Sequence, residues 1–260
     1  MLRRVQGERV LMISGPRALL MQAAHPLAVE GLLAHTGSLD EPYERLRRTA
    51  EVMTAIGFGT REEGEAAARR VRAMHRRVRG TLSRDAGPFR AGTPYAADDP
   101  ELLMWVLFTL VDSGMVVYER FVASMSREEK EAYWADFRVV GEQFGLPPER
   151  MPADLDALRD YERGMYASGH LVVTDWARTT ARRIVLDPPA PLTMRPLVEA
   201  VNAATIALLP APIRDQYRFG PLPPAPLRGA AVAAAGEYVK RLVLPLAPAR
   251  LRRIPAARAA

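Results

Sequence analysis

The sequence predicts an all-α fold, and two observations carry this prediction. Apolar residues recur with a helical period along most of the 260 residues, whereas runs with strand-like alternation are rare. Prolines, glycines and capping residues separate the helical segments from one another. A chain of this length with 48% hydrophobic residues can form one large helical domain whose core encloses a ligand.

Prolines and capping residues mark where the expected helices begin, and glycines or prolines mark where most of them end. Thr60 with Glu63, and Ser126 with Glu129, have the spacing of capping boxes. The expected helices span residues 16–24, 26–35, 42–57, 62–80, 100–124, 126–145, 154–168, 174–186, 195–208 and 229–242. Residues 81–97 are expected to form a loop, and proline-rich joints are expected at 188–191, 210–212 and 221–226.

The segment 100–124 is apolar nearly all round, so it is expected at the centre of the fold. Its apolar run is interrupted by Asp112, which favours a buried helix over an integral membrane span. Residues 1–228 are expected to form the ligand-binding helical domain. Residues 229–260 are expected to add a C-terminal helix and a frayed basic tail that packs on this domain or extends from it.

Composition excludes several classes of site. The chain has no cysteine, so disulfides, thiolate nucleophiles and iron–sulfur clusters are excluded, and any metal must be held by nitrogen or oxygen. The net charge of +6 comes almost entirely from arginine, but no basic arm or nucleic-acid motif accompanies it, so no nucleic-acid partner is expected. No convincing export signal is found, and the expected location is cytoplasmic.

His75 lies where a packed leucine is usual. In the expected helix 62–80, Val71, His75 and Val78 share one face, whereas the other face is mostly arginine. An imidazole on such an apolar stripe is either a core histidine with its hydrogen bonds satisfied or a ligand. Periodicity alone leaves both interpretations open and favours the first.

The expected helix 42–57 has polar residues on its apolar side as well. Arg45 and Thr49 project into the apolar stripe, and Arg48 lies at its edge. A buried guanidinium is costly unless an anion pairs with it, so this face requires an anionic partner. That partner could be a bound ligand or a carboxylate of the protein, for which Asp112 is the first candidate.

The other histidines are less informative on their own. His25 precedes a proline at a helix break, where a capping or core role is the common one. His35 is expected at a helix end and His170 in an exposed turn. The chain contains none of the usual signatures for zinc proteases, phosphate-binding loops or serine hydrolases.

Several motifs, taken in order, resemble the MpaB-type oxygenase family, which shares a catalytic domain with the latex-clearing rubber oxygenases. The first is GPRALLMQAAHP at residues 15–26. The others are HTG at 35–37, RLRRT at 45–49, FGT at 58–60, VxxxHxxVxG at 71–80, DPELLMWV at 99–106, GLP at 145–147 and AR at 177–178. The resemblance covers nearly the whole chain in the right order.

This resemblance implies an all-α domain that encloses a b-type haem, with His75 as the proximal iron ligand. It implies that Arg45, Arg48 and Thr49 lie on the distal side, where their donors can stabilise negative charge that develops on the oxidant. Arg17 and Arg178 are expected to pair with the haem propionates, and His25 is expected to help bind the cofactor. The imidazole of His75 is expected to donate its other N–H to a neighbouring acceptor.

The sequence also departs from the family. Arg48 stands where rubber oxygenases have a lysine, and an arginine stays protonated and cannot act as a base. Leu107 stands where many members have a histidine. The resemblance therefore implies a haem-dependent oxygenase or peroxygenase-like enzyme that uses O₂ or peroxide on a small apolar or aromatic substrate.

Two alternatives remain at this stage. The protein could be a haem-binding carrier or sensor without turnover, or a helical binding module without haem that uses Arg45 and Arg48 to bind an anion. The sequence leaves the substrate and the formation of oligomers open.

Overall fold

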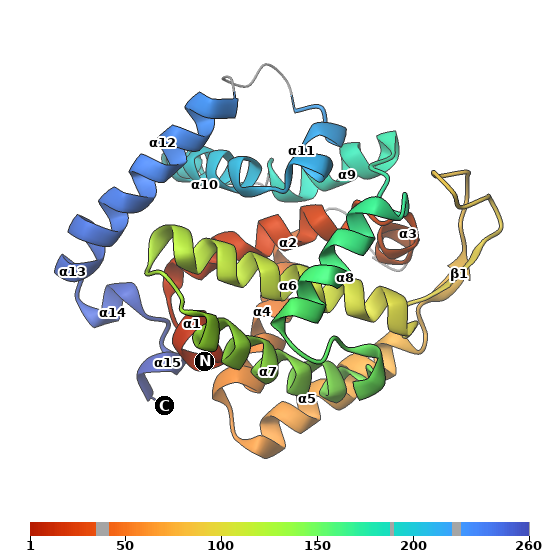
Figure 1. Cartoon of the computed structure of the whole chain (residues 1–260), viewed down its shortest axis with the longest axis horizontal. Coiled ribbons are helices and arrows are strands. Elements are labelled where there is room, and N and C mark those ends of the chain that lie inside the picture. Colours follow the sequence, from red (N-terminus) through yellow and green to blue (C-terminus); the bar gives the residue numbers. More distant parts are fainter. Residues whose placement is uncertain (35–41, 188–189, 220–224, 260) are drawn as a thin grey trace.

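Helices form nearly all of the regular structure, so the prediction of an all-α fold is confirmed (Figure 1). The computed structural model describes residues 1–34, 42–187, 190–219 and 225–259; for 33–34, 42–48, 225 and 258–259 it describes the backbone only. The first half contains α1 (Leu2–Gln6), α2 (Ser14–Gln22), α3 (Pro26–Ala34), α4 (Pro42–Phe58), α5 (Arg61–His75), α6 (Pro100–Phe121) and α7 (Arg127–Phe144). The second half contains α8 (Leu155–Ala167), α9 (Asp175–Val185), α10 (Arg195–Leu208), α11 (Ala211–Gln216), α12 (Ala225–Tyr238), α13 (Leu244–Leu246), α14 (Ala249–Arg252) and α15 (Ala256–Ala259).

The central position expected for the apolar segment is confirmed, because α6 runs through the middle of the molecule (Figure 1). Asp99 caps its N-terminus by accepting a hydrogen bond from the backbone N–H of Glu101, and Pro100 occupies the first turn. α2 and α7 pack along it. α6 is long and apolar enough to cross a membrane, but 72% of its most apolar window is buried inside the protein, as in a central core helix.

Capping and proline signals located most helix ends correctly. Both expected capping boxes form: Thr60 and Ser126 each accept from the backbone N–H three residues ahead, and Glu63 and Glu129 bond back to the cap. α11 was not predicted, because its prolines were interpreted as a joint. Pro212 lies in the first turn of α11, where a proline fits without the loss of a helical hydrogen bond.

The expected helix 62–80 is too long, because α5 ends at His75. The chain then enters a short strand, β1 (Arg79–Thr81), which pairs antiparallel with β2 (Pro94–Ala96). The expected loop 81–97 therefore contains the end of β1, the whole of β2 and the connection between them. A Cβ on Gly80 would lie 2.6 Å from Tyr95 Oη, so only glycine lets the tyrosine of β2 lie against β1.

The C-terminal tail is docked, which corrects the expectation of a frayed end. Arg252 donates from Nη2 and Nε to the carboxylate of Glu8, with shortest distances of 2.8 Å, and the backbone N–H of Ile254 donates to Gly7 O. The tail thus returns to the N-terminus, and both ends of the chain lie close together (Figure 1). α12 crosses α6 so closely that a Cβ on Gly236 would lie 2.4 Å from Arg120 O.

Candidate active site

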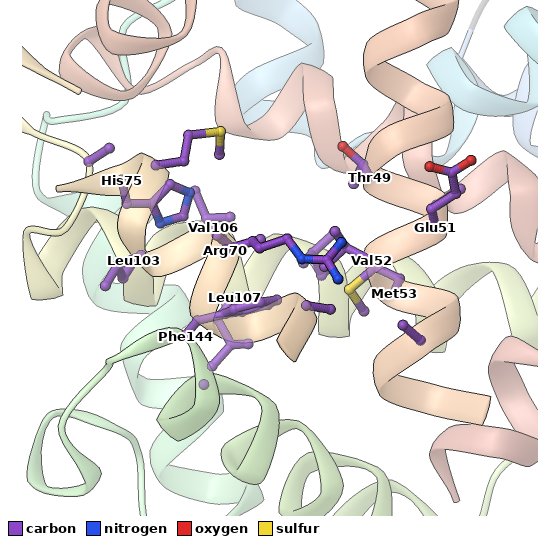
Figure 2. Close-up of a pocket in the computed structure, with 18 of the residues that line it drawn as sticks. Thr49, Glu51, Val52, Met53, Arg70, His75, Leu103, Val106, Leu107 and Phe144 are labelled. Atoms are coloured by element: carbon purple, nitrogen blue, oxygen red, sulfur yellow. The ribbon is translucent and has the colours of Figure 1, made fainter. Parts of the chain in front are cut away.

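A large cleft lies between α3, α4, α5 and α6, and the C-terminal end of α7 closes one part of its wall (Figure 2). Its volume is about 1910 Å³. Small-molecule pockets usually measure roughly 300–1,000 Å³, so this cleft has room for a cofactor together with a substrate. Most of its lining is apolar; the apolar lining residues include Leu27, Val52, Met53, Leu103, Val106, Leu107, Leu110, Phe144 and Leu146.

His75 lies in the wall of this cleft as the last residue of α5. Val71 and Val78 line the cleft with it, so the shared face expected from the sequence is present although the helix ends at His75. In Figure 2 its ring projects from α5 near Leu103 and Val106 of α6. Among the residues that the structure describes, His75 is the one histidine that lines the cleft.

Burial favours the neutral form of the His75 imidazole. Burial lowers its pKa from the usual value, and the negative charge of Asp98 opposes this shift only in part. Asp98 forms an ion pair with Arg79, with 2.7 Å between Oδ2 and Nη2. A neutral imidazole has a free lone pair, which is the form that coordinates a metal.

His75 Nδ1 is buried and has no hydrogen-bond partner. The acceptor expected for the second ring nitrogen is therefore not found among the described residues. A buried polar atom without a partner costs about 1–3 kcal/mol, which a ligand or a water molecule could recover. Nδ1 is closed off from the open space of the cleft, so its missing partner does not by itself mark a ligand site.

Thr49 of α4 lines the same cleft, on the opposite side from His75 in Figure 2. His75, expected on the proximal side, and Thr49, expected on the distal side, therefore line the same cleft. Arg45 and Arg48 belong to the first half of the same helix, but their side chains lie outside the described part of the structure. His35 also lies outside the described residues.

Arg17 is not placed in the cleft. Its guanidinium is buried between α2 and α6, where Nη1 lies 2.7 Å from Asp112 Oδ2 and donates to Ser113 Oγ at 2.7 Å. Nε donates to the backbone oxygen of Leu208 at 2.8 Å. Asp112, the candidate partner for Arg45, is therefore paired with Arg17.

Arg178 and His25 also lie outside the lining of the cleft. Arg178 donates to the backbone oxygens of Gln216 and Val173 and pairs with Asp175. His25 faces a separate cavity of about 290 Å³. The centroid of its ring lies 5.4 Å from that of Phe89 and 6.3 Å from that of His170. Burial, with a further contribution from His170, lowers the pKa of His25 to about 4.

Arg70 is a lining residue that the sequence analysis missed. It was counted with the arginine face of its helix, yet its side chain points from α5 toward α4 across the cleft (Figure 2). Its position beside Val71, at the edge of the apolar stripe, is the signal that could have found it. Within the described residues, no three His, Cys, Asp or Glu side chains gather in a way that could hold a metal ion.

The fold and the cleft define a helical domain with a large, mainly apolar cleft beside a histidine. Over residues 2–252 the chain matches the family described as ER-bound oxygenase mpaB/B'/Rubber oxygenase, catalytic domain, and it belongs to this family. This match confirms the resemblance found in the sequence and supports an oxygenase role. No curated protein matches the chain significantly. No solved structure does so either.

Proposed function

We propose that this protein is a haem-dependent oxygenase in which His75 holds the iron and the cleft binds a small apolar or aromatic substrate with O₂ or peroxide. The observation that carries the proposal is the position of His75, whose neutral form burial favours, in the wall of a mainly apolar cleft of about 1910 Å³. Membership of an oxygenase family supports the type of reaction.

The residues of the cleft fit a haem. A haem iron needs only one ligand from the protein, so a lone histidine suffices where a bare metal ion would need several side chains. The porphyrin is a large apolar plate, and the walls from α4, α5 and α6 are mainly aliphatic. The volume leaves space for a second molecule beside the plate.

Haem supplies the activation of oxygen or peroxide when it is bound, and the protein supplies the ligand, the orientation and the environment. His75 fixes the side on which the iron is held. When a ligand fills the cleft, the aliphatic walls around it lower the local dielectric constant and so strengthen its electrostatic interactions. Thr49, on the other side, carries a hydroxyl that can donate a hydrogen bond to the oxidant.

Arg45 and Arg48 precede Thr49 on α4, and the family resemblance gives them the same distal role. A guanidinium stays protonated, so Arg48 would act as a hydrogen-bond donor and fixed positive charge, with no part as a base. Leu107, which is 3% exposed and lines the cleft, makes this part of the wall apolar. This wall favours a substrate without charge at that end.

A haem titration followed at the Soret band tests the proposal. The wild-type protein is expected to bind one haem, whereas His75→Ala should bind it at least about tenfold more weakly and with a shifted band, because the variant lacks the imidazole that would hold the iron. His170→Ala is the matched control, since His170 faces the separate cavity with His25. A protein that does not bind haem, or a His75→Ala variant with an unchanged spectrum and affinity, would contradict the proposal.

Oxygen consumption separates the proposed enzyme from a haem carrier. The loaded protein should consume O₂ or peroxide when apolar or aromatic compounds are added. Thr49→Val, which keeps the shape of the side chain, should lower turnover about tenfold or more while haem content stays the same. Stable haem binding without oxidation of any compound in a broad panel would favour the carrier.

A further inference from the structure

The described lining of the cleft carries three glutamates, Glu51, Glu62 and Glu63, and two arginines, one of which has no polar partner among the described residues. Arg3 and Arg70 are the arginines of its described lining. Arg3 donates from Nε to the backbone oxygen of Gly57 at 2.8 Å. Arg70 forms no ion pair and no hydrogen bond with any residue that the structure describes, although its side chain extends from α5 toward Val52 and Met53 (Figure 2).

A guanidinium directed across an apolar cleft is positioned to bind an anion that enters the same cleft. Its planar fork matches a carboxylate, to which it can donate two parallel hydrogen bonds. Arg70 is exposed, so a ligand must first cover it and displace water before the aliphatic groups of the cleft can strengthen such a pair. A ligand with an apolar body and a carboxylate at its edge would therefore satisfy both the walls and Arg70.

The two arginines expected to bind propionates are occupied elsewhere. Arg17 is paired with Asp112, and Arg178 with Asp175 and the backbone oxygen of Gln216. Neither lines the cleft. The cation that faces the ligand space and has no partner in the described structure is thus Arg70.

We infer that Arg70 binds the carboxylate of the ligand that occupies the cleft, either a propionate of the cofactor or a carboxylate of the substrate. If the carboxylate is a propionate, this inference rests on the proposed function, since only a haem brings propionates to the site. If the carboxylate belongs to the substrate, the substrate is an amphiphilic acid, with its carboxylate at Arg70 and its apolar chain against α4 and α6.

Binding titrations with esterified ligands test the inference. Ferric haem and its dimethyl ester, which lacks free propionates, are titrated into wild-type protein and into Arg70→Gln and Arg70→Lys. Decanoate and decanol are titrated by calorimetry into the same proteins. Arg69→Gln is the matched control, because Arg69 is as exposed as its neighbour but pairs with Glu65 and does not line the cleft.

If the carboxylate belongs to the cofactor, Arg70→Gln should weaken haem binding about tenfold or more and leave binding of the dimethyl ester unchanged. If it belongs to the substrate, Arg70→Gln should weaken decanoate about tenfold or more, with haem and decanol unaffected. Arg70→Lys should recover part of the loss in either case, and Arg69→Gln should bind like wild type.

Unchanged affinity of Arg70→Gln for both haem and decanoate would overturn the inference. So would an equal loss for the acids and their uncharged analogues, because that pattern reports a change of shape. If wild-type protein fails to bind haem, the proposed function falls, and the decanoate and decanol titrations decide the inference about Arg70 on their own.

Discussion

Arg17 of α2 and Asp112 of α6 form a buried ion pair, with 2.7 Å between Nη1 and Oδ2. The side chain of Arg17 is 3% exposed. Its N–H groups point at Ser113 Oγ and Leu208 O, so the contact with Asp112 is an ion pair and not an aligned hydrogen bond. Through these contacts one guanidinium joins α2, α6 and α10, which places Arg17 in the scaffold around the cleft.

Removal of one partner of this pair is expected to destabilise the protein. Arg17→Met leaves the carboxylate of Asp112 without its partner, and such a loss typically costs about 3–5 kcal/mol. Urea unfolding measures this change. Arg17→Met with Asp112→Asn should recover a large part of the loss, and haem affinity of the folded variant should stay within about twofold of wild type because Arg17 does not line the cleft.

The docked tail gives a second prediction about stability. Glu8 is a buried carboxylate whose side chain is 1% exposed, and Arg252 forms a two-pronged pair with it. Arg252→Met is expected to cost about 2–4 kcal/mol, because Arg253 Nη2, at 3.7 Å, compensates only weakly. Arg250→Met, a change at an exposed position of the same short helix, should change the free energy of unfolding by less than about 0.5 kcal/mol.

Gly141 of α7 supports the wall of the cleft at Leu107. A Cβ at this position would lie 2.8 Å from Leu107 Cδ2 and 2.8 Å from Met151 Sδ, so Gly141→Ala must displace both side chains. The expected loss is about 1–3 kcal/mol, together with a change in the affinity for apolar ligands. Gly164→Ala in α8 meets no atom within 4 Å and should stabilise by about 0.5–1 kcal/mol.

His25 is expected to make stability depend on pH in the acid range. Its pKa is about 4 in the folded protein and about 6.5 in the unfolded chain. The unfolded state therefore takes up the proton first, and the stability that His25 contributes is complete above pH 6.5 and is lost as the pH falls toward 4. The difference of about 2.5 pKa units corresponds to about 3 kcal/mol.

The free energy of unfolding at pH 7 and at pH 4, in wild type and in His25→Gln, checks this prediction. The glutamine does not titrate, so the variant should lose about 3 kcal/mol less than wild type over this interval. Equal losses in the two proteins would show that His25 is already accessible to protons in the folded state.

Local signals predicted the helices well because their ends are set by residues close in sequence. Thr60, Ser126 and Asp99 each cap a helix through side-chain contacts within three residues. The end of α5 at His75 could not be predicted in this way. It depends on the pairing of Gly80 with Tyr95, which lies beyond the reach of a helical pattern.

Those parts of the candidate site that depend on local sequence pattern could be predicted, and those that depend on distant contacts could not. The shared face of Val71, His75 and Val78 is a local property, and all three line the cleft. The placement of Arg17 and Arg178 depends on which distant groups reach them, namely Asp112 and Gln216 O. The position of Arg70 beside Val71, at the edge of the apolar stripe, is a local signal, but the direction of its side chain toward α4 depends on a helix that is not next to it in sequence.

The absorption spectrum of haem-loaded His75→Gly, recorded before and after addition of imidazole, tests the central role of His75 most directly. The small glycine leaves a space where free imidazole can replace the lost side chain as the iron ligand. We expect the Soret band of the variant to be shifted from its wild-type position and to return to it when imidazole is added, with no such response in His170→Gly. A His75→Gly protein whose spectrum equals that of wild type without imidazole would contradict the assignment of His75 as the iron ligand.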